Sequence, residues 1–558
     1  MFRNRPSRIA VRGLLMLCTT VALGILGAGG ARAGALMTSL VPQDVADHVA
    51  ARVAEPDPSS RLQLAIALPM RNQAELKHLF DDIYDPSSRN YHRYLSVAQF
   101  TERFGPTKAD YAKALRFFSS NGLAITGVAA NRYLIEGSAS VGTLERMLHV
   151  NFGLYQRPGE SRRFIAPDRE PTLGLDVPVL RIIGLDDADP PTNRLVQRKL
   201  DVAAQSPVKG SGPNGWYLGN DIRLAYYGIF LSDGKDQSLG LMELGPYDPS
   251  GVQNYFTQFG PPLTTAVVPI STDGSPATCS STCNDAEQAL DIEYAIAMAP
   301  GLKQVQVYVA RSAASVLNRM ATDNTSAQLS TSWGWSHGER SVDEPIFLEM
   351  AVQGQTLLTA SGDYSSLRAS GPWPEESAYI TAVGGTDLQT SSPGGPWLSE
   401  TAWSGSAGGP SLDKTIKIPA YQLPFINDQN QGSTQVRNVP DIAGDANTVN
   451  YICYSRGCSG GNGGTSFASP IWAGFIALAN QRSAHYGDGR IGFLNPLLYN
   501  MGGKHFAPYI YHDIVSGTSG KYSAVPSYDL VTGFGSPQGF AFIEKLIQAA
   551  NPSVTSQR

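Results

Sequence analysis

The sequence of 558 residues has little charge for its length. Charged residues make up 16% of it, against roughly 25% in a typical soluble protein. A surface with few carboxylates and salt bridges loses little stability when acid protonates its acidic groups. The composition therefore fits exposure to acid. The chain is also too long for one ordinary domain, and it has ample material for a large core.

Cysteine is scarce as well, with five residues in the whole chain. Cys18 falls in an N-terminal apolar segment, and the other four form two close pairs, Cys279 with Cys283 and Cys453 with Cys458. Zinc sites normally recruit histidine or a C-x-x-C spacing, and neither is present here. In an exported chain, two close pairs favour two short-loop disulfides over a metal site.

The sequence also lacks a basic surplus and a long internal apolar run. Residues 201–558 carry 18 basic against 29 acidic side chains, which excludes nucleic acid as a partner because phosphate binding needs a basic face. Residues 1–33 contain five arginines and no acid, an apolar stretch over 14–26, and then Ala31-Arg32-Ala33. This pattern is typical of a secretory signal peptide and is short for a membrane span of about 20 residues. We therefore expect a secreted protein without a membrane anchor.

Residues 34–190 have the pattern of an independent α+β unit. Helical spacing over 72–84, from Ser96 onward and over 107–120 is interleaved with strand-like stretches at 62–68, 128–135 and 166–183. This order predicts a small antiparallel sheet with helices on one face. Residues 191–213 are rich in proline, serine and glycine, which indicates a linker that is cut during maturation. We expect its basic side chains to be exposed, namely those of Arg194, Arg198, Lys199 and Lys209.

Residues 214–558 alternate strand-like and helical segments. Strand-like runs occur at 238–243, 305–309, 357–360 and 379–383, and helical ones at 288–298 and 470–481. Such alternation predicts a parallel sheet with helices on both faces. Functional sites in such sheets gather at the carboxyl ends of the strands.

A candidate nucleophile lies in Gly463-Gly464-Thr465-Ser466, directly before an apolar helical run. A serine at this junction lies at the positive end of the helix dipole, near free backbone N–H groups. Pro470 would lie in the first turn of the helix, where a missing N–H costs little. The alternative role for Ser466 is a helix N-cap, which is common for an isolated G-T-S sequence.

Histidine offers no convincing base for this serine. After the linker, none of the histidines has the H-G-T-H setting of subtilisin-like enzymes. Glu287 and Asp291 instead lie at i and i+4, on one face of a predicted helix. Such a pair shares a proton, and it can take a proton from serine at about pH 3–5, where imidazole is already protonated. The alternative is a solvated helix face, which the apolar neighbours of the pair disfavour.

Two further stretches have chemistry that suits peptide cleavage. Ser361-Gly362-Asp363 ends an apolar strand. A protonated Asp363 there can donate a hydrogen bond to an oxyanion, with the Ser466 N–H as second donor. Ser332-Trp333-Gly334 ends another strand, whose backbone can pair with an extended substrate. The alternatives are an ordinary turn aspartate and a core tryptophan.

Taken in order, these stretches resemble a known family. Residues 85–95, DPSSRNYHRYL, stand before Phe104-Gly105-Pro106 and resemble the activation prodomain of the sedolisin (kumamolisin-like) serine-carboxyl peptidases. Residues 215–545 contain the family's catalytic motifs in matching order, at 243–245, 287–291, 330–334, 361–363 and 464–470. The resemblance implies a subtilisin-like parallel sheet with helices on both faces. It also implies a ferredoxin-like α+β prodomain that assists folding and blocks the active site, with no catalytic part for His92 or His149.

By this resemblance Ser466 is the nucleophile and Glu287 the general base and acid. Asp291 is the proton partner of Glu287, and Asp363 is the oxyanion acid. The supporting network and the substrate-binding residues would be Glu243, Ser332, Trp333, Gly334, Ser361 and Gly362. Tyr364, after S-G-D, and Pro246, after E-L-G, depart from the family pattern and are expected to reshape subsites without changing the chemistry.

The resemblance also implies one structural Ca²⁺ site near the C-terminus. Its ligands would be the side chains of Asp513 and Asp529 and the carbonyls of Ile514, Val525 and Ser527, an all-oxygen set that suits Ca²⁺. Many relatives have glycine at the positions of Val525 and Ser527, so these backbone ligands depend on the loop keeping its turn. The alternative is a pair of ordinary loop aspartates.

The sequence thus predicts a secreted, acid-acting serine-carboxyl endopeptidase made as a self-processing monomeric zymogen. Its partners would be protein or peptide substrates and its own prodomain as intramolecular inhibitor. The predicted parts are a signal peptide at 1–33, a prodomain at 34–190, a linker at 191–213 and a catalytic domain at 214–558. The alternatives are a tripeptidyl aminopeptidase of the same family and a non-catalytic secreted binding protein on this fold.

Overall fold

The computed structural model describes residues 35–37, 39–197, 209–229, 231–280, 283–368 and 373–551. The predicted signal peptide at 1–33 lies outside these residues, as do residues 198–208 of the predicted linker. Among the described residues, none of the helices combines the length and the apolar character that crossing a membrane requires.

The N-terminal unit, residues 39–191, is built on a four-stranded antiparallel sheet. The strand order is β4 (Ala124–Val128), β5 (Leu134–Ser140), β3 (Arg61–Ala67) and β9 (Arg181–Ile183). Its helices are α1 (Gln43–Ala46), α2 (Gln73–Tyr84), α3 (Val97–Phe104), α4 (Lys108–Ser120) and α5 (Val141–Leu148). A smaller sheet joins β2 (Ala51–Ala54), β6 (Phe152–Gln156) and β7 (Arg163–Pro167), while β1 (Ala35–Leu36) pairs with β8 (Thr172–Leu173). Of the strand-like stretch 128–135, Val128 ends β4 and residues 134–135 begin β5, with a turn between them.

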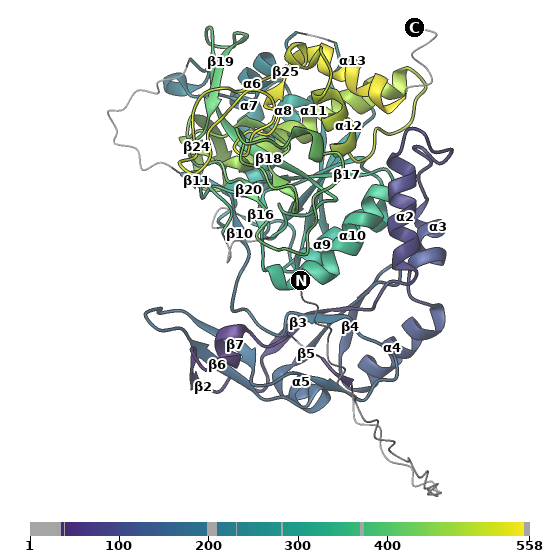
Figure 1. Ribbon diagram of the computed structural model, residues 1–558. Helices are drawn as coiled ribbons and strands as arrows, with labels where there is room; N and C mark the ends of the chain where they lie inside the picture. The colour runs from purple at the N-terminus through teal and green to yellow at the C-terminus, as the bar shows by residue number, and fades with distance from the viewer. Residues whose placement is uncertain are drawn as a thin grey trace, which may run out of the picture.

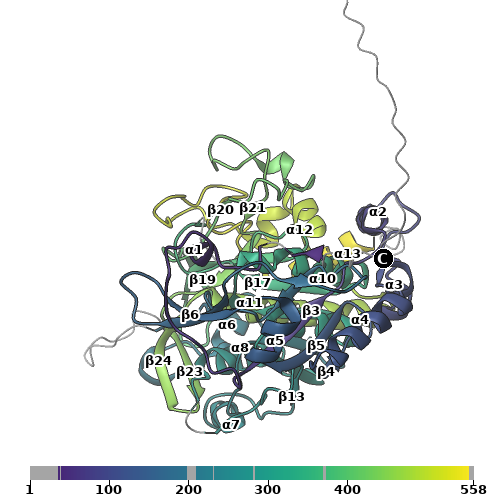
Figure 2. The ribbon, with the colours of Figure 1, turned by 90° about the horizontal axis from the view of Figure 1, so that it is seen from below.

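The two faces of this sheet pack against different partners. Because side chains alternate along a strand, Leu64 and Ile66 of β3 face the helices α4 and α5 of their own unit. Ala65 and Ala67 point the other way, toward helices of the C-terminal unit. Figure 2, seen from below, shows α4 and α5 over the outer face, and Figure 1 shows the inner face turned toward α9 and α10. The small alanines let these helices approach closely.

The C-terminal unit, residues 213–551, holds an eight-stranded sheet. Its path is β13 (Ala266–Ser271), β14 (Gln304–Val309), β12 (Ser238–Glu243), β15 (Gln328–Thr331), β17 (Thr356–Ala360), β18 (Thr381–Thr390) and β19 (Trp397–Ala402), with β22 (Ile442–Asp445) also paired to β18. All pairs are parallel except β18 with β19. Near-continuous apolar strands of this kind need cover on both faces.

Helices cover both faces of this sheet, as predicted. On one side lie α6 (Gly219–Tyr226), α7 (Pro249–Gln258), α8 (Ala286–Met298), α11 (Thr465–His485), α12 (Asn495–Gly502) and α13 (Gly539–Ala550). On the other lie α9 (Ala313–Asp323) and α10 (Arg340–Val352), which also contact the N-terminal sheet. The mixed α/β fold predicted from the sequence is confirmed.

Short elements complete the C-terminal unit and the link to it. They are β10 (Thr192–Asn193), β11 (Val196–Gln197), β16 (Trp333–Gly334), β20 (Gly409–Pro410), β21 (Asn438–Val439), β23 (Asn450–Tyr454), β24 (Gly457–Gly463), β25 (Tyr511–His512), β26 (Ser536–Pro537) and the 3₁₀ turns Pro213–Gly215, His337–Glu339, Leu423–Phe425 and Ala507–Tyr509.

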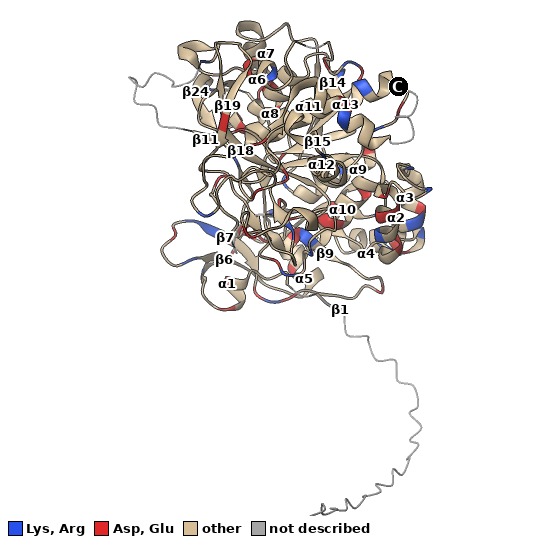
Figure 3. Cartoon of the chain, turned by 45° about the horizontal axis from the view of Figure 1, so that its top comes forward, with Lys and Arg blue, Asp and Glu red and all other residues tan. Residues whose placement is uncertain are grey.

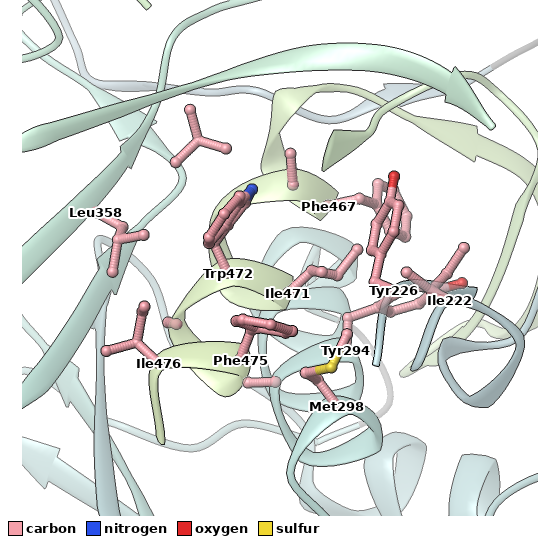
Figure 4. Packing of buried hydrophobic residues seen from close by; sticks show 14 of the residues in the cluster. Ile222, Tyr226, Tyr294, Met298, Leu358, Phe467, Ile471, Trp472, Phe475 and Ile476 are labelled. Carbon is pink, nitrogen blue, oxygen red and sulfur yellow. The ribbon is translucent and has the colours of Figure 1, made fainter. Parts of the chain in front are cut away.

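The central helix α11 is buried along most of its length. Figure 4 shows Phe467, Trp472 and Phe475 of α11 packed against Tyr294 of α8 and Leu358 of β17. The Trp472 indole N–H donates to the Ala443 carbonyl at 2.7 Å. Burying each such side chain stabilises the fold by about 1.5–3 kcal/mol. The helix is therefore a rigid platform for whatever lies at its start.

The position of Pro470 differs from the prediction. Because α11 begins at Thr465, Pro470 lies in the second turn, not the first. A proline has no N–H to give to the carbonyl four residues earlier, which is that of Ser466. The Ser332 hydroxyl lies 3.3 Å from this carbonyl, as the longer branch of a bifurcated bond whose shorter branch goes to Asp291 Oδ1. The proline thus frees an acceptor that ties α11 to the strand end at Ser332.

The DPSSRNYHRYL stretch anchors the N-terminal unit to the C-terminal unit. The Tyr94 hydroxyl donates to the Ile491 carbonyl at 3.0 Å, and the Leu95 N–H donates to the Val352 carbonyl at 2.9 Å. Tyr94 fits between two glycines: a Cβ on Gly354 would lie 2.6 Å from its ring, and one on Gly492 would lie 2.1 Å from its hydroxyl. The motif that carried the resemblance is therefore a docking element.

Candidate active site

Ser466 is the second residue of α11, where backbone N–H groups have no intrahelical acceptor. Gly464, just before the helix, has φ 118°, a conformation that side chains other than hydrogen disfavour. A Cβ there would lie 2.0 Å from the Arg194 carbonyl oxygen and 2.6 Å from Asp363 Oδ2. The Ser466 side chain is fully buried, and its Oγ has no hydrogen-bond partner among the described residues.

Glu287 lies in the first turn of the buried helix α8, close to Ser466. Burial raises the pKa of Glu287 well above its ordinary value, and the Ser466 hydroxyl partly offsets that shift by its interaction with the carboxyl. The two groups are near enough for this interaction, yet neither Glu287 oxygen has an aligned hydrogen bond in the described structure. A small rotation of either side chain is needed to make one.

Asp291, one turn further along α8, joins Glu287 to a third carboxyl. Burial, and then the charges of Glu243 and Glu287, raise the pKa of Asp291 well above its ordinary value. The Ser332 hydroxyl donates to Asp291 Oδ1 at 2.8 Å. Burial raises the pKa of Glu243 to about 8, and the Trp333 indole N–H donates to Glu243 Oε2 at 2.9 Å. Three buried carboxyls this close cannot all ionise together.

Asp363 follows β17 and is held from one side. The Thr465 N–H and hydroxyl both donate to Asp363 Oδ1 at 2.8 Å. Oδ2 is buried with no partner among the described residues. Burial raises the pKa of Asp363 to about 6. Oδ2 is thus positioned to carry a proton that points away from Thr465.

The predicted substrate-binding residues divide into two groups. Ser332, Trp333 and Gly334 lie at the open end of β15 and in β16. Ser361 and Gly362 have backbone groups that are used within the fold: the Ser361 N–H donates to the Val383 carbonyl at 2.9 Å, and the Gly362 carbonyl accepts from the Ala407 N–H at 2.9 Å. These two residues fix the strand end that carries Asp363.

A segment of the chain itself lies along Ser332-Trp333-Gly334. We call Thr192–Gln197 the cleft segment. In its first part, β10, Thr192 and Asn193 pair antiparallel with β16, and the Arg194 N–H donates to the Ser332 carbonyl at 3.1 Å. Its second part, β11, pairs antiparallel with β24, Val196 opposite Gly463. The predicted exposure of Arg194 is wrong, because only 4% of this residue is exposed.

The pocket that holds Arg194 was not predicted from the sequence. The guanidinium lies 5.2 Å from the Tyr364 ring centroid, and its Nη2 donates to Glu375 Oε2 at 3.3 Å. Arg194 was expected at the surface because the predicted linker 191–213 is rich in proline, serine and glycine, and local composition carries no signal of distant partners. The adjacent Glu375 and Glu376 in an aromatic and proline-rich stretch were the available hint.

The predicted calcium ligands come together in part. The Ser527 N–H donates to Asp513 Oδ2 at 2.9 Å, and the Val525 N–H donates to Asp529 Oδ2 at 3.2 Å. Both carboxylates therefore lie against the same loop, 525–527. Ser527 has φ 70°, in the left-handed region that favours glycine. The turn is thus kept without glycine.

Both cysteine pairs are bonded in the structure. The S–S distances are 1.97 Å for Cys279–Cys283 and 1.98 Å for Cys453–Cys458. The second disulfide closes the β23–β24 hairpin that precedes the Ser466 turn. Cys279, Cys283 and Asp285 lie near enough together to suggest a metal site, but the two sulfurs are bonded to each other and do not serve as thiolate ligands.

A cavity of about 360 Å³ lies away from this site, between the N-terminal sheet and the start of α9 and α10. Arg181, Asp186 and Glu339 are among its lining residues, and none of the candidate catalytic residues lines it. The cleft beside Ser466 is not open in the same way, because the cleft segment fills it.

Known proteins resemble this chain along most of its length. A family model described as "Pro-kumamolisin, activation domain" matches residues 39–179. Kumamolisin of Bacillus sp. (strain MN-32) is 28% identical over 501 residues, covering 82% of this chain and 87% of the relative. The chain is thus similar to peptidases of the kumamolisin and sedolisin kind over most of its length. Among other homologues, Tripeptidyl-peptidase SED3 of Arthroderma otae is 24% identical, covering 88% of this chain and 92% of the relative.

A solved structure of Pseudomonas sedolisin, a serine-carboxyl proteinase complexed with two molecules of pseudo-iodotyrostatin, matches with a TM-score of 0.51 and 24% identity. The match covers 63% of this chain and 99% of that chain and supports the sedolisin fold. The matches confirm the sequence-based identification of a sedolisin-type chain with an activation domain and are consistent with a serine-type peptidase. They include both kumamolisin and a tripeptidyl-peptidase, so they leave the mode of cleavage to be decided.

Proposed function

We propose that this protein is a secreted, acid-acting serine-carboxyl endopeptidase made as a self-processing zymogen. The observation that carries the proposal is a buried Ser466 Oγ at the positive end of α11, without a hydrogen-bond partner in the part of the chain that the structure describes, beside a chain of buried carboxyls on α8 and β12. His337, a described histidine of the C-terminal unit, forms an ion pair with Glu376 at 3.4 Å. The titratable group that interacts with the Ser466 hydroxyl is the Glu287 carboxyl, which serves as the base in this proposal.

In the proposed reaction, Ser466 Oγ attacks the carbonyl carbon of the substrate and its proton passes to Glu287. Collapse of the tetrahedral intermediate breaks the C–N bond, and the leaving amine takes this proton from Glu287. Water then attacks the acyl-enzyme with Glu287 as base, which releases the acid product and restores the serine. Asp291 and Glu243 take up part of the charge change through the shared proton.

The oxyanion of the intermediate would accept hydrogen bonds from protonated Asp363 Oδ2 and from the Ser466 N–H. Such prearranged donors stabilise the transition state where charge develops. Trp333 holds Glu243 by its indole N–H, and Ser332 holds Asp291 by its hydroxyl. These two residues therefore orient the carboxyl chain and also border the substrate strand.

The raised pKa of Glu287 has a defined consequence for catalysis. A carboxylate with a raised pKa binds the serine proton more strongly than an ordinary one, which favours attack. It is also ionised in a smaller fraction of molecules at acid pH. Because ionisation of one of the three carboxyls disfavours ionisation of the others, the network titrates as a unit and protons can move within it.

The path of the cleft segment favours an endopeptidase over a tripeptidyl peptidase. A tripeptidyl peptidase needs a free amino group three residues before the cut bond. Here Thr192 pairs with Gly334, and the chain continues before it through Pro191 and Pro190 toward β9. A cleft that accommodates a chain continuing in this direction has room for an internal stretch of substrate.

The remaining parts of the proposal concern stability and export. The two carboxylates that meet at the 525–527 loop, with the carbonyls of Ile514, Val525 and Ser527, offer the oxygen donors that Ca²⁺ prefers. Residues 1–33 would direct secretion, and the mature enzyme would act as a monomer on proteins or peptides. The basic residues of the described chain are scattered in Figure 3, in keeping with a partner other than nucleic acid.

The deciding experiment compares precursors at about pH 4. The Ser466→Ala precursor should stay full length and digest no protein, and Glu287→Gln should lose nearly all activity. Ser469→Ala is the matched control, because it removes another buried hydroxyl of α11, one that bonds Ser330 at 2.8 Å. A Ser466→Ala precursor that matures unaided would contradict the proposal.

A further inference from the structure

The cleft segment crosses the candidate active site in the manner of a bound peptide. It pairs with β16 before Arg194 and with β24 after Leu195. Both pairings are antiparallel, and together they hold the chain in an extended form on either side of the Ser466 turn. Leu195 packs against the main hydrophobic core of the C-terminal unit. The two residues between the pairings, Arg194 and Leu195, therefore lie opposite the start of α11.

The register identifies which peptide bond is presented for cleavage. The Arg194 carbonyl oxygen and Asp363 Oδ2 both lie against the α carbon of Gly464, at 2.0 Å and 2.6 Å from the position of a Cβ there. The carbonyl of Arg194 thus lies beside the proposed oxyanion acid. The Arg194 charge also lowers the pKa of both Glu287 and Asp363, against the larger raising effect of burial. These observations place the peptide bond that follows Arg194 at the position where cleavage would occur.

The Arg194 side chain enters a pocket whose end is acidic. Glu375 and Arg194 form a buried ion pair, with 1% and 4% of their side chains exposed. Tyr364, one of the departures from the family pattern, lies against the guanidinium by its ring and donates its hydroxyl to Glu375 Oε1. Tyr364 therefore both borders the pocket and orients its acid.

We propose that Arg194–Leu195 is the first bond that the zymogen cuts in itself, and that Glu375 with Tyr364 forms a pocket selective for arginine or lysine directly before the cut bond. The proposal rests on the proposed function. In the cut, the Arg194 carbonyl passes from the amide to a Ser466 ester and then, with one water, to a carboxylate. Leu195 leaves with a new amino terminus.

The selectivity follows from what remains when the cleft segment leaves. Glu375 keeps the Tyr364 hydroxyl but loses the cation that balanced it, and a buried carboxylate without a cation is costly. The neighbouring Glu376 is already satisfied by the Ser411 hydroxyl and by the Leu412 N–H at 3.0 Å. Glu375 is therefore the acid that a basic substrate side chain would meet.

The first test follows the wild-type precursor at about pH 4 in a time course, with the earliest new N-terminus read by sequencing. It should begin at Leu195. Arg194→Lys should keep both the site and most of the rate, whereas Arg194→Leu should slow the first cut about 10²-fold. Arg198→Leu is the matched control for a basic linker residue and should change neither. A first cut elsewhere, or equal rates for Arg194→Leu and wild type, would overturn the proposal.

The second test separates charge recognition from a structural role. Two peptides that differ only in arginine or citrulline before the cut bond have the same shape and differ in charge. The wild-type enzyme should prefer arginine by about 10²-fold in kcat/KM, and Glu375→Gln should bring the ratio close to one. Glu376→Gln is the matched control and should keep the preference. A preference that survives Glu375→Gln would refute the pocket.

A double-mutant cycle on the precursor covers the case in which Glu375→Gln matures slowly. If the pair recognises charge, Arg194→Leu should be harmless in the Glu375→Gln background, and the effects should be non-additive. Additive effects would count against the proposal. If Ser466→Ala still matures, the proposed function has failed; if maturation needs Ser466 but starts at another bond, this inference alone has failed.

Discussion

Thr465 donates two hydrogen bonds to a single oxygen of Asp363, one from its backbone N–H and one from its hydroxyl, both at 2.8 Å. The residue next to the candidate nucleophile thus orients the candidate oxyanion acid. With Oδ1 occupied, the proton of the neutral carboxyl belongs on Oδ2, which lies toward the Arg194 carbonyl. The first turn of α11 therefore carries the nucleophile and also holds the oxyanion donor in place.

Replacing Thr465 by valine keeps the shape of the side chain and removes the hydroxyl that donates to Asp363 and accepts from the Gly362 N–H at 3.0 Å. We expect kcat to fall about 10- to 10²-fold with little change in KM, because the lost bond orients a group that acts in the transition state. Steady-state kinetics on a peptide substrate measure this. Thr359→Val is the matched control, since Thr359 is equally buried and makes a long 3.4 Å bond. Equal losses in both variants would contradict a positioning role.

The pH dependence of kcat should follow the protonation state of the Asp363 carboxyl. Burial raises its pKa to about 6, so the carboxyl is protonated and able to donate below that pH and loses this ability above it. We therefore expect kcat to fall as pH rises through about 6. In Asp363→Asn the two Thr465 bonds hold the amide oxygen and leave the non-titrating NH₂ at the Oδ2 position.

The kcat–pH profile of Asp363→Asn should consequently lack this alkaline limb, at a lower overall rate. Asp363→Ala, which has no donor, should lose about 10²–10³ in kcat at every pH. If the kcat of Asp363→Asn still falls at the same alkaline pH, the titrating group responsible for that fall is not Asp363.

The contact between the two units offers a prediction about maturation. Asn131 is fully buried and donates to Asn318 Oδ1 and Glu349 Oε2, both at 2.7 Å. Asn131→Ala leaves these acceptors unpaired, at a cost of about 1–3 kcal/mol. We expect the precursor to unfold at lower temperature and the N-terminal unit to separate faster after the first cut.

Thermal unfolding and the rate at which protein-digesting activity appears measure these effects. Asn121→Ala is the control, because it removes an exposed amide that caps α4 within the same unit. Maturation of Asn131→Ala at the wild-type rate would show that this contact does not restrain release.

Calcium binding predicts a ligand-dependent gain in stability. A ligand that binds only the folded state at about 100 times its Kd adds about 2.7 kcal/mol. Ca²⁺ should raise the Tm of the wild-type protein, and Asp513→Ala should abolish the rise. Asp428→Ala removes an exposed aspartate elsewhere and should respond as the wild type does. A rise that persists in Asp513→Ala would place the ion at another site.

How much could be predicted depended on the range of the interactions. The apolar run at 238–243 and the helical character of 288–298 are local features, so β12 and α8 lie where the sequence indicated. The start of α11 was placed too late because Pro470 suggested a first turn. No local pattern predicted that the Ser332 hydroxyl would approach the Ser466 carbonyl, which has no helical N–H donor because residue 470 is proline.

The candidate site followed the same rule. Glu287 and Asp291 were found because one helix turn joins them. Arg194 was misplaced because its burial depends on Tyr364 and Glu375, residues more than 150 positions away that meet it only through the fold. Long-range pairing of a linker with a strand edge has no periodic signature.

The inner face of the N-terminal sheet has a consequence for the enzyme after maturation. Ala65 and Ala67 cover an apolar flank of α9 and α10 that includes Val316 and Phe347. When the N-terminal unit departs, that flank meets water. The free enzyme would then expose an apolar surface remote from its cleft. We expect this surface to adsorb to apolar solids or to self-associate, so that in storage the mature enzyme should adsorb to container walls to which the precursor does not.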